Sequence, residues 1–409
     1  MTHQTVNGRI CIGRRVWWYG GGEPSDGRVD GWLGIADSSV SLGARELCCL
    51  MGTDGGSFRK AAAKLKKVGQ IDVSAESFRV IVEVEGTRML EARRAGLLNP
   101  GWTANDCRSS PSEPSCVLVG ADGVMVPVIT EAEKAKRRAG HKRVRRRGGK
   151  KRRDGRPSRD REPLAARVGK KRKRRQRGAD HGWREFKIGT GYSLDKEHCW
   201  VWATKGNHEE FGRQLRRETC KLRLDQADRV ASVTDGAKWI RRQMQTRLSK
   251  LDETILDFYH FAEHVADASA SCWGVETTES KAWTGHVLDR ATRDGAPGVL
   301  EEILLAKQTL CGRKINAGLS KRAAKTALAE LENYVATRTE MMDYPKFLAA
   351  GYDIGSGPTE AKCKTIPRRL KGSGMRWNLP NAESIAALAC TEQSNMLTTY
   401  WALQRQRLT

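Results

Sequence analysis

The chain has 409 residues, which is enough for two or three domains, and 39% of them are hydrophobic, so a sizeable core can form. No apolar run reaches the ~18–20 residues of a membrane span, and no apolar signal segment opens the chain, so we expect a cytoplasmic protein with no membrane partner. The eleven cysteines include no CxxC pair, which favours reduced thiols over a zinc site, and the net charge of +25 favours nucleic acid as a partner.

The first hundred residues predict a small, mostly helical N-terminal domain. Residues 1–40 contain a Trp- and Gly-rich stretch that indicates a short hairpin or an irregular cap. Three helices are then predicted, over about Leu42–Met51, over about Ser57–Lys67, and from the N-cap Ser74 onward. The short link before Ser74 is compatible with a helix-turn-helix, but the third helix carries three acids, Glu76, Glu83 and Glu85. A DNA-reading domain and a purely structural three-helix unit both remain open.

A linker and a highly basic arm follow. Residues 101–115 are rich in Pro and Ser, which is typical of a linker between domains. The segment from Lys134 to Arg177 contains 24 Lys and Arg against three acids, so it carries +21 of the total +25. Such a segment repels itself and lacks apolar residues, so we expect it to be disordered alone and to bind a phosphate backbone. A solvated linker without a specific role is the alternative.

The rest of the chain predicts an α/β domain with a long helical interruption. Strands are expected over Val117–Ile129, Trp183–Thr190, Cys199–Ala203, Val230–Thr234 and Thr254–Phe258, with helices after Asn207 and over Lys238–Ser249. This order predicts an RNase H-like domain with a mixed five-stranded sheet, whose first part spans residues 116–260 including the basic arm. Residues 261–350 predict an all-helical insertion, and residues 351–409 complete the domain with a Glu360 helix and one closing helix over about Ala382–Gln404, capped by Asn381.

Three carboxylates lie where such a fold can bring them together. Asp122 and Asp235 follow short β-branched runs, and Glu360 opens a Lys- and Arg-rich helix. Two Mg²⁺ (or Mn²⁺) ions about 3.5–4 Å apart need few protein oxygens and can serve both ends of a phosphodiester displacement. Taken singly, an Asp-Gly after a strand is most often a turn, so the prediction depends on the combination.

Several motifs resemble those of DDE transposases from bacterial insertion sequences, most closely the ISKra group. They are ADGVMVPV, TDGAKWI, LDFYHFAEHV and IGSGPTEAKCKTIPRRLKGSGMRW, so the resemblance runs from about residue 117 to the C-terminus. It implies that Asp122, Asp235 and Glu360 form a catalytic triad holding two Mg²⁺ (or Mn²⁺) ions. It also points to Asp257 and to His260, which would assist at the scissile or flipped DNA end; capping of the next helix is the alternative role for His260. Cysteine pairs found near the N-terminus of many relatives are absent here.

The resemblance implies double-stranded DNA, both transposon ends and target, as the partner of a homodimer or higher oligomer in a prokaryotic cytoplasm, associated with the nucleoid. The basic residues expected to contact DNA are Lys362, Lys364, Arg368, Arg369, Lys371 and Arg376 around Glu360, and Arg145, Arg146, Arg147, Arg172, Arg174 and Arg175 in the arm. Trp273 and Trp283 could stack on a base, although core packing is the commoner fate. A non-catalytic nucleic-acid-binding protein on an RNase H-like scaffold and a nuclease without strand transfer are the alternative functions.

Overall fold

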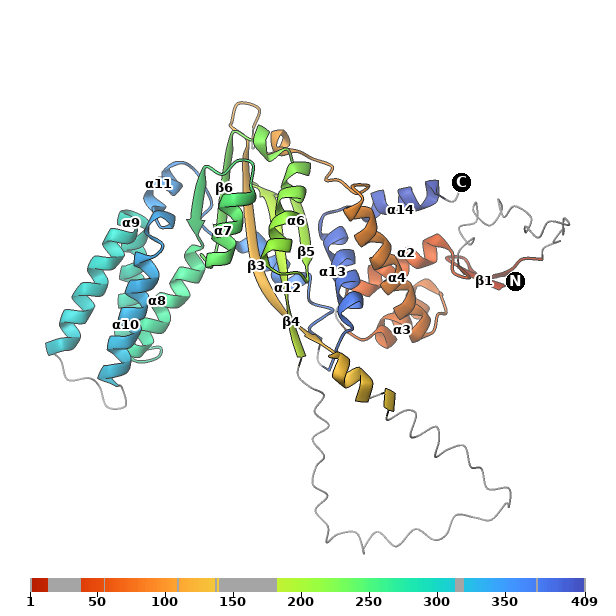
Figure 1. Cartoon of the computed structure of the whole chain (residues 1–409), viewed down its shortest axis with the longest axis horizontal. Helices are drawn as coiled ribbons and strands as arrows, with labels where there is room; N and C mark the ends of the chain where they lie inside the picture. The colour runs from red at the N-terminus through yellow and green to blue at the C-terminus, as the bar shows by residue number, and fades with distance from the viewer. Residues whose placement is uncertain are drawn as a thin grey trace, which may run out of the picture.

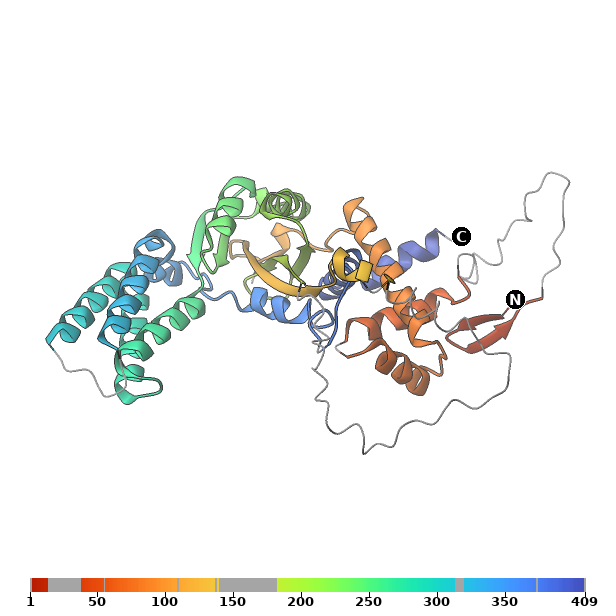
Figure 2. The same cartoon turned by 60° about the horizontal axis from the view of Figure 1, so that its bottom comes forward.

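The computed structural model of the chain describes residues 2–13, 38–54, 56–108, 110–136, 138–139, 182–312, 320–372 and 374–407. A mixed β-sheet occupies the centre of the molecule (Figure 1). The N-terminal helices and the last two helices lie on one side of it, and helices α8 to α11 lie on the other side in both views (Figure 2). No helix in these described ranges is long and apolar enough to cross a membrane.

The predicted mixed sheet of five strands is confirmed. Its strands are β3 (Cys116–Val128), β4 (Gly182–Ser193), β5 (Cys199–Thr204), β6 (Arg229–Thr234) and β7 (Glu253–Leu256). The order across the sheet is β5-β4-β3-β6-β7, with β3 antiparallel to β4, β4 antiparallel to β5, and β6 parallel to both β3 and β7. The short strands β6 and β7 are largely buried, which explains why they are nearly continuous runs of apolar and small residues.

Helices cover both faces of the sheet. Trp200 of β5 donates its indole N–H to Glu218 of α6 (His208–Lys221), and α7 (Lys238–Arg247) packs beside α6. On the opposite face, the Thr190 and Thr359 hydroxyls lie 2.6 Å apart and join β4 to α12 (Gly357–Thr365). A short 3-10 turn, η3 (Leu224–Gln226), connects α6 to β6. The helix that carries Glu360 is thus fixed directly to the sheet.

The described part of the N-terminal region contains a hairpin and three helices, and most of the predicted Trp- and Gly-rich stretch lies outside the described residues. The hairpin pairs β1 (Thr2–Thr5) with β2 (Gly8–Cys11), and the helices are α2 (Leu42–Thr53), α3 (Phe58–Gly69) and α4 (Ala75–Arg94). Ser74 caps α4 as predicted, by accepting the Ser77 N–H. Helix α4 packs along α13 (Leu379–Gln393), and its Glu85 is only 1% exposed because it binds Arg45 of α2 and Tyr400. These contacts give α4 a structural role inside the protein.

The segment 101–115 is bound to the sheet domain and does not behave as a free linker. It contains the short 3-10 turn η1 (Ala104–Asp106), whose Ala104 N–H donates to the Leu222 carbonyl at 2.8 Å. Ser115 donates both its N–H and its hydroxyl to Asp228, at 2.8 and 2.9 Å. The Pro- and Ser-rich composition indicates a segment with little regular structure. It does not reveal the hydrogen bonds that hold the segment against the sheet domain.

Helices α8 (Phe258–Trp273), α9 (Thr278–Gly312), α10 (Lys321–Ala336) and α11 (Tyr344–Ala349), with the turn η4 (Thr339–Met341), occupy the range in which helices are predicted. Helix α9 is kinked at Gly295, whose φ of 67° lies in the left-handed region and is followed by Pro297. Trp273 and Trp283 pack against each other with ring centres 4.7 Å apart and are partly buried against this helical core. Core packing therefore accounts for both tryptophans.

The prediction of one closing helix over Ala382–Gln404 is wrong. Helix α13 ends at Gln393 and α14 runs over Leu397–Gln406. The break lies at Asn395, whose φ of 56° is left-handed, a conformation that Asn tolerates better than most residues. The first helix also starts earlier than predicted, after the N-cap Asn378, because Pro380 is favoured in the first turn.

Replacing Gly86 by Ala is expected to destabilise the protein by about 1–3 kcal/mol. A Cβ atom at Gly86 of α4 would clash with the Ser384 backbone carbonyl of α13, and a helix backbone cannot move aside cheaply. Gly285→Ala in α9 is the matched control, because nothing lies within 4 Å of its Cβ position. That control should stabilise the protein by about 0.5–1 kcal/mol through helix propensity, and chemical denaturation measures both changes. Equal effects of the two substitutions would contradict the close approach of α4 and α13.

Candidate active site

Side chains from four separate elements line one small cavity of about 170 Å³. Asp122 comes from β3, Asp235 follows β6, and Glu360 comes from α12. Asp257 and His260 come from the junction of β7 and α8. The four residues predicted to be catalytic therefore face a common space, although they are spread over more than half of the chain.

The register of the sheet explains why Asp122 and Asp235 are neighbours. The parallel ladder of β3 and β6 ends with Val119 opposite Ser232. Asp122 lies three residues beyond the first of these and Asp235 three beyond the second, so continuing the register brings the two carboxylates side by side. Asp235 lies just after its strand, as predicted, whereas Asp122 lies inside β3, within the strand predicted over Val117–Ile129. Strand β3 continues because β4 pairs with it without a break as far as Val128.

The carboxyl group of Asp122 is in an electrostatically unfavourable place. Burial raises the pKa of Asp122, and the nearby charge of Asp235 raises it further. The Gly123 N–H, at 2.5 Å, and the Cys363 thiol are the hydrogen-bond donors that oppose this shift. Among the described residues, no Lys or Arg pairs with Asp122 or with Asp235. Two adjacent carboxylates without a protein cation are the arrangement that a divalent cation stabilises.

Glu360 occupies an exposed position on α12 and carries its own counter-ion. Its Oε1 lies 2.6 Å from Lys364 Nζ, one helical turn away. Within the described part of the chain, no three His, Cys, Asp or Glu side chains lie close enough together to surround a metal ion. The oxygen donors of Asp122 and Asp235 fit Mg²⁺ in kind and in placement, and Glu360 joins them only by exchanging Lys364 for the ion.

Asp257 connects the two helices that border the cavity. It is 8% exposed and caps α8 by accepting the Tyr259 N–H at 2.9 Å and the His260 N–H at 3.5 Å. Its other oxygen accepts the hydroxyl of Ser356, the residue just before the Glu360 helix. Asp257, and not His260, therefore performs the capping role that the sequence left open for His260.

The His260 side chain is free to face the cavity. It is 38% exposed, and its Nδ1 lies 3.4 Å from Glu263 Oε2 on the same helix. The neighbouring His264 stacks on Tyr334 with ring centres 4.1 Å apart. Burial, and then the charge of His260, lower the pKa of His264, and of the two histidines it is His260 that lines the cavity.

Sequence reasoning missed Ser356 and Cys363. Ser356 lies in the IGSGPTE motif, and Cys363 lies three residues after Glu360, on the same side of a helix. Burial and the neighbouring Asp122 raise the pKa of the Cys363 thiol, which keeps it protonated and able to donate to Asp122. The helical spacing of Cys363 from Glu360 was a usable signal, whereas the contact of Ser356 with Asp257 was not visible in the sequence.

The basic residues near Glu360 differ in how far their side chains are exposed. Arg368 and Lys371 are exposed, Lys362 donates to Gln393 at 2.9 Å, and Arg376 pairs with Glu133 at 3.1 Å. Arg369 is 1% exposed and donates to the Asp54 and Gly56 carbonyls, so its prediction as a DNA contact is wrong. Burial lowers the pKa of Arg369 to about 10, and its guanidinium covers the Phe58 ring. The predicted arm contacts at Arg145, Arg146, Arg147, Arg172, Arg174 and Arg175 lie outside the described residues.

Comparison of the chain with the known protein families and with curated proteins finds no match to either.

Proposed function

We propose that the protein is a DDE-type DNA transposase that cleaves and joins DNA strands with Asp122, Asp235 and Glu360. The observation that carries the proposal is the convergence of these carboxylates and His260 on one cavity from separate elements. A turn or surface role for each acid would not require them to meet. The resemblance of the surrounding motifs to insertion-sequence transposases of the ISKra group supports the same assignment.

The topology of the sheet supports an RNase H-like catalytic domain. Counted along the chain, its strands lie in the order third, second, first, fourth, fifth, with only the second antiparallel to the others. The first and fourth strands are adjacent and carry Asp122 and Asp235. Helices α8 to α11 fall between the fifth strand and the Glu360 helix, where the proposed insertion would lie.

Each side chain has a role that follows from its place. Asp122 and Asp235 would hold divalent cations from the sheet, and Glu360 would complete the ligand set from α12. Two such ions, when bound, stabilise the attacking and leaving oxygens of an in-line phosphodiester displacement. His260 supplies an imidazole that can hold a proton beside the phosphate. Asp257 and Ser356 position the two helices, because one carboxylate binds the starts of both.

A non-catalytic nucleic-acid-binding function is favoured by one observation, the ion pair of Glu360 with Lys364. A scaffold that only binds DNA has no need to release this pair. In the catalytic function the Glu360 carboxylate leaves Lys364 to bind an ion, whereas in the non-catalytic function the pair persists. An assay of DNA cleavage distinguishes the two functions.

The test uses the full chain and DNA carrying the sequences that flank its reading frame. This DNA is incubated with a target plasmid and with Mg²⁺, Mn²⁺ or EDTA, and the product ends are sequenced. We expect cation-dependent cuts at the flanks and joining of the new 3′ hydroxyls to the plasmid. Cutting without joining would identify a nuclease, and binding without either product would identify the non-catalytic scaffold.

A further inference from the structure

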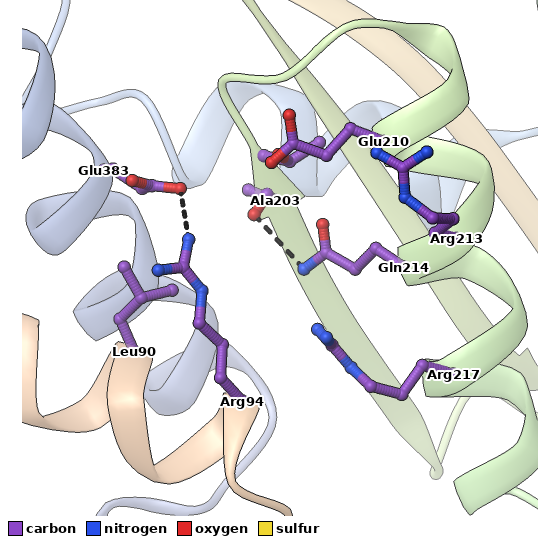
Figure 3. A pocket seen from close by; sticks show the side chains of 9 residues that line it. Leu90, Arg94, Ala203, Glu210, Arg213, Gln214, Arg217 and Glu383 are labelled. Carbon is purple, nitrogen blue, oxygen red and sulfur yellow. Dashed lines mark hydrogen bonds and ion pairs between the residues drawn. The ribbon is translucent and has the colours of Figure 1, made fainter.

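A second cavity, of about 250 Å³, lies along the edge of the sheet beside β5. Its walls come from α4, α6, α13 and the end of β5, and Figure 3 shows Arg94 and Arg217 reaching in from opposite sides. None of its lining residues belongs to the cavity of Asp122 and Asp235. It is therefore a separate site.

One stripe of α6 faces this cavity. Glu210, Arg213, Gln214 and Arg217 follow the i, i+3, i+4, i+7 spacing of a single helix face. Gln214 donates to the Ala203 carbonyl of β5 at 3.4 Å, which helps to satisfy an otherwise open strand edge. Arg213 makes no hydrogen bond or ion pair with any described residue, so its guanidinium is available to a ligand.

The walls carry more positive than negative charge. The lining cations are Arg94, Arg213 and Arg217, and the lining acids are Glu210 and Glu383; their ion-pair partners outside the lining are Lys205 and Glu218. Glu383 already has two cations, Arg94 at 2.9 Å and Lys205 at 2.8 Å. Buried Glu218 is likewise shared by several, including Arg217 at 3.1 Å. The three lining cations outnumber the two lining acids, and Arg213 is not used by either acid, so the cavity can attract an anion.

We propose that this cavity binds a backbone phosphate of the polynucleotide on which the protein acts. Arginine presents a planar fork that matches phosphate oxygens. The cavity is smaller than the roughly 300–1,000 Å³ typical of a drug-sized ligand, and among the described residues only Leu90 and Ala203 give it an apolar lining. It suits a phosphate of a passing strand better than a nucleotide that needs a surface for its base.

The position of the cavity relates it to the catalytic one. Lys187 of β4 pairs with both Gly123 of β3 and Thr204 of β5, so the end of β5 is level with Asp122. Two strand spacings of about 4.8 Å separate β5 from β3, which a nucleic-acid backbone easily spans. One polynucleotide can therefore contact both cavities. This step rests on the proposed function, since that function makes the polynucleotide the substrate.

The test is the salt dependence of DNA binding by the full chain in EDTA. Fluorescence anisotropy of a labelled duplex gives the slope of log affinity against log salt, which falls by about 0.9 for each lost phosphate contact. Arg213→Gln and Arg94→Gln, from opposite walls, should each lower the slope by about this amount. Arg216→Gln, an exposed neighbour on α6 outside the cavity, is the matched control and should leave it unchanged. Melting curves verify folding, and Arg213 has no protein partner to lose.

A second arm titrates inorganic phosphate at constant ionic strength. If Arg213→Gln weakens phosphate binding but not the DNA slope, the cavity serves free phosphate and the proposal is overturned. It is also overturned if both wall variants match Arg216→Gln in each measurement. The binding measurement does not depend on cleavage, so the two proposals can fail separately. If the two wall variants lower the slope but the wild-type protein cuts no DNA, the phosphate site is supported and the proposed transposase is refuted.

Discussion

Replacing Asp122 by Asn is expected to abolish cation-dependent DNA cleavage and to raise the melting temperature of the protein. The activity falls because the variant lacks a carboxylate that would hold the ions. Electrostatic stabilisation of this kind amounts to several kcal/mol, so the loss of rate should be on the order of 10³-fold or more. DNA binding in EDTA should persist, because the phosphate contacts lie elsewhere.

The gain in stability follows from the sign of the pKa shift. Burial, and then Asp235, raise the pKa of Asp122 above its ordinary value of 3.8, so the folded protein holds this proton more tightly than the unfolded chain does. The contribution of Asp122 to stability is therefore greatest at acid pH. It is lost as the pH rises from the unfolded-state pKa of Asp122 through its higher folded-state pKa. At neutral pH the charged Asp122 opposes folding, and Asn removes that charge. The difference in melting temperature should shrink as the pH is lowered.

The response to Mg²⁺ separates a metal ligand from a merely strained acid. An ion that binds only the folded protein stabilises it by mass action, by about 2.7 kcal/mol at one hundred times its dissociation constant. Mg²⁺ should therefore raise the melting temperature of the wild type but not that of Asp122→Asn. Asp225→Asn, at an exposed acid in η3, is the control that should keep both cleavage and the Mg²⁺ shift. A full Mg²⁺ shift in Asp122→Asn would remove Asp122 from the proposed ligand set.

The sheet could be predicted because its signals are local. Strands such as VASVT are short β-branched runs, and the aspartate after β6 is where the run ends. The place of Asp122 was harder to predict, since Gly120 and Gly123 look like a turn. Gly120 serves packing instead, because a Cβ there would clash with the buried Thr359 of α12. The partner that keeps β3 extended is β4, which begins only at Gly182 after the basic segment.

Buried charges were the main features that the sequence could not place. Arg369 stands among exposed basic residues, yet its partners are carbonyls of Asp54 and Gly56, more than 300 residues earlier. Glu85 was counted among the acids that argue against DNA reading by the third helix, yet its side chain is buried and does not reach the surface. A sequence shows the type of a charged residue but not the distant partner that allows its burial. Arg369 and Glu85 were therefore both predicted to lie at the surface.

Replacing Glu85 by Gln is expected to cost about 3–5 kcal/mol of stability, because it removes the carboxylate that forms a buried ion pair with Arg45. Glu85 Oε1 accepts from Arg45 at 3.0 Å and from Arg88 at 2.9 Å. Its Oε2 accepts the Tyr400 hydroxyl at 2.6 Å, so one carboxylate joins α2, α4 and α14. Denaturant unfolding measures the loss, and Glu91→Gln, at an exposed position of the same helix, should stay within about 0.5 kcal/mol of the wild type.

A double variant tests whether the cost arises from the loss of the Arg45–Glu85 ion pair or from the other contacts of the Glu85 carboxylate. Arg45→Met combined with Glu85→Gln removes the buried cation together with the buried acid. Because a buried ion pair and an apolar replacement of similar volume often differ little in stability, this variant should recover most of the loss. Arg88 does not prevent the recovery, since 32% of its side chain already reaches solvent. A double variant no more stable than Glu85→Gln alone would show that the hydrogen bond to Tyr400, and not the charge of Arg45, sets the strength of this contact between the two ends of the chain.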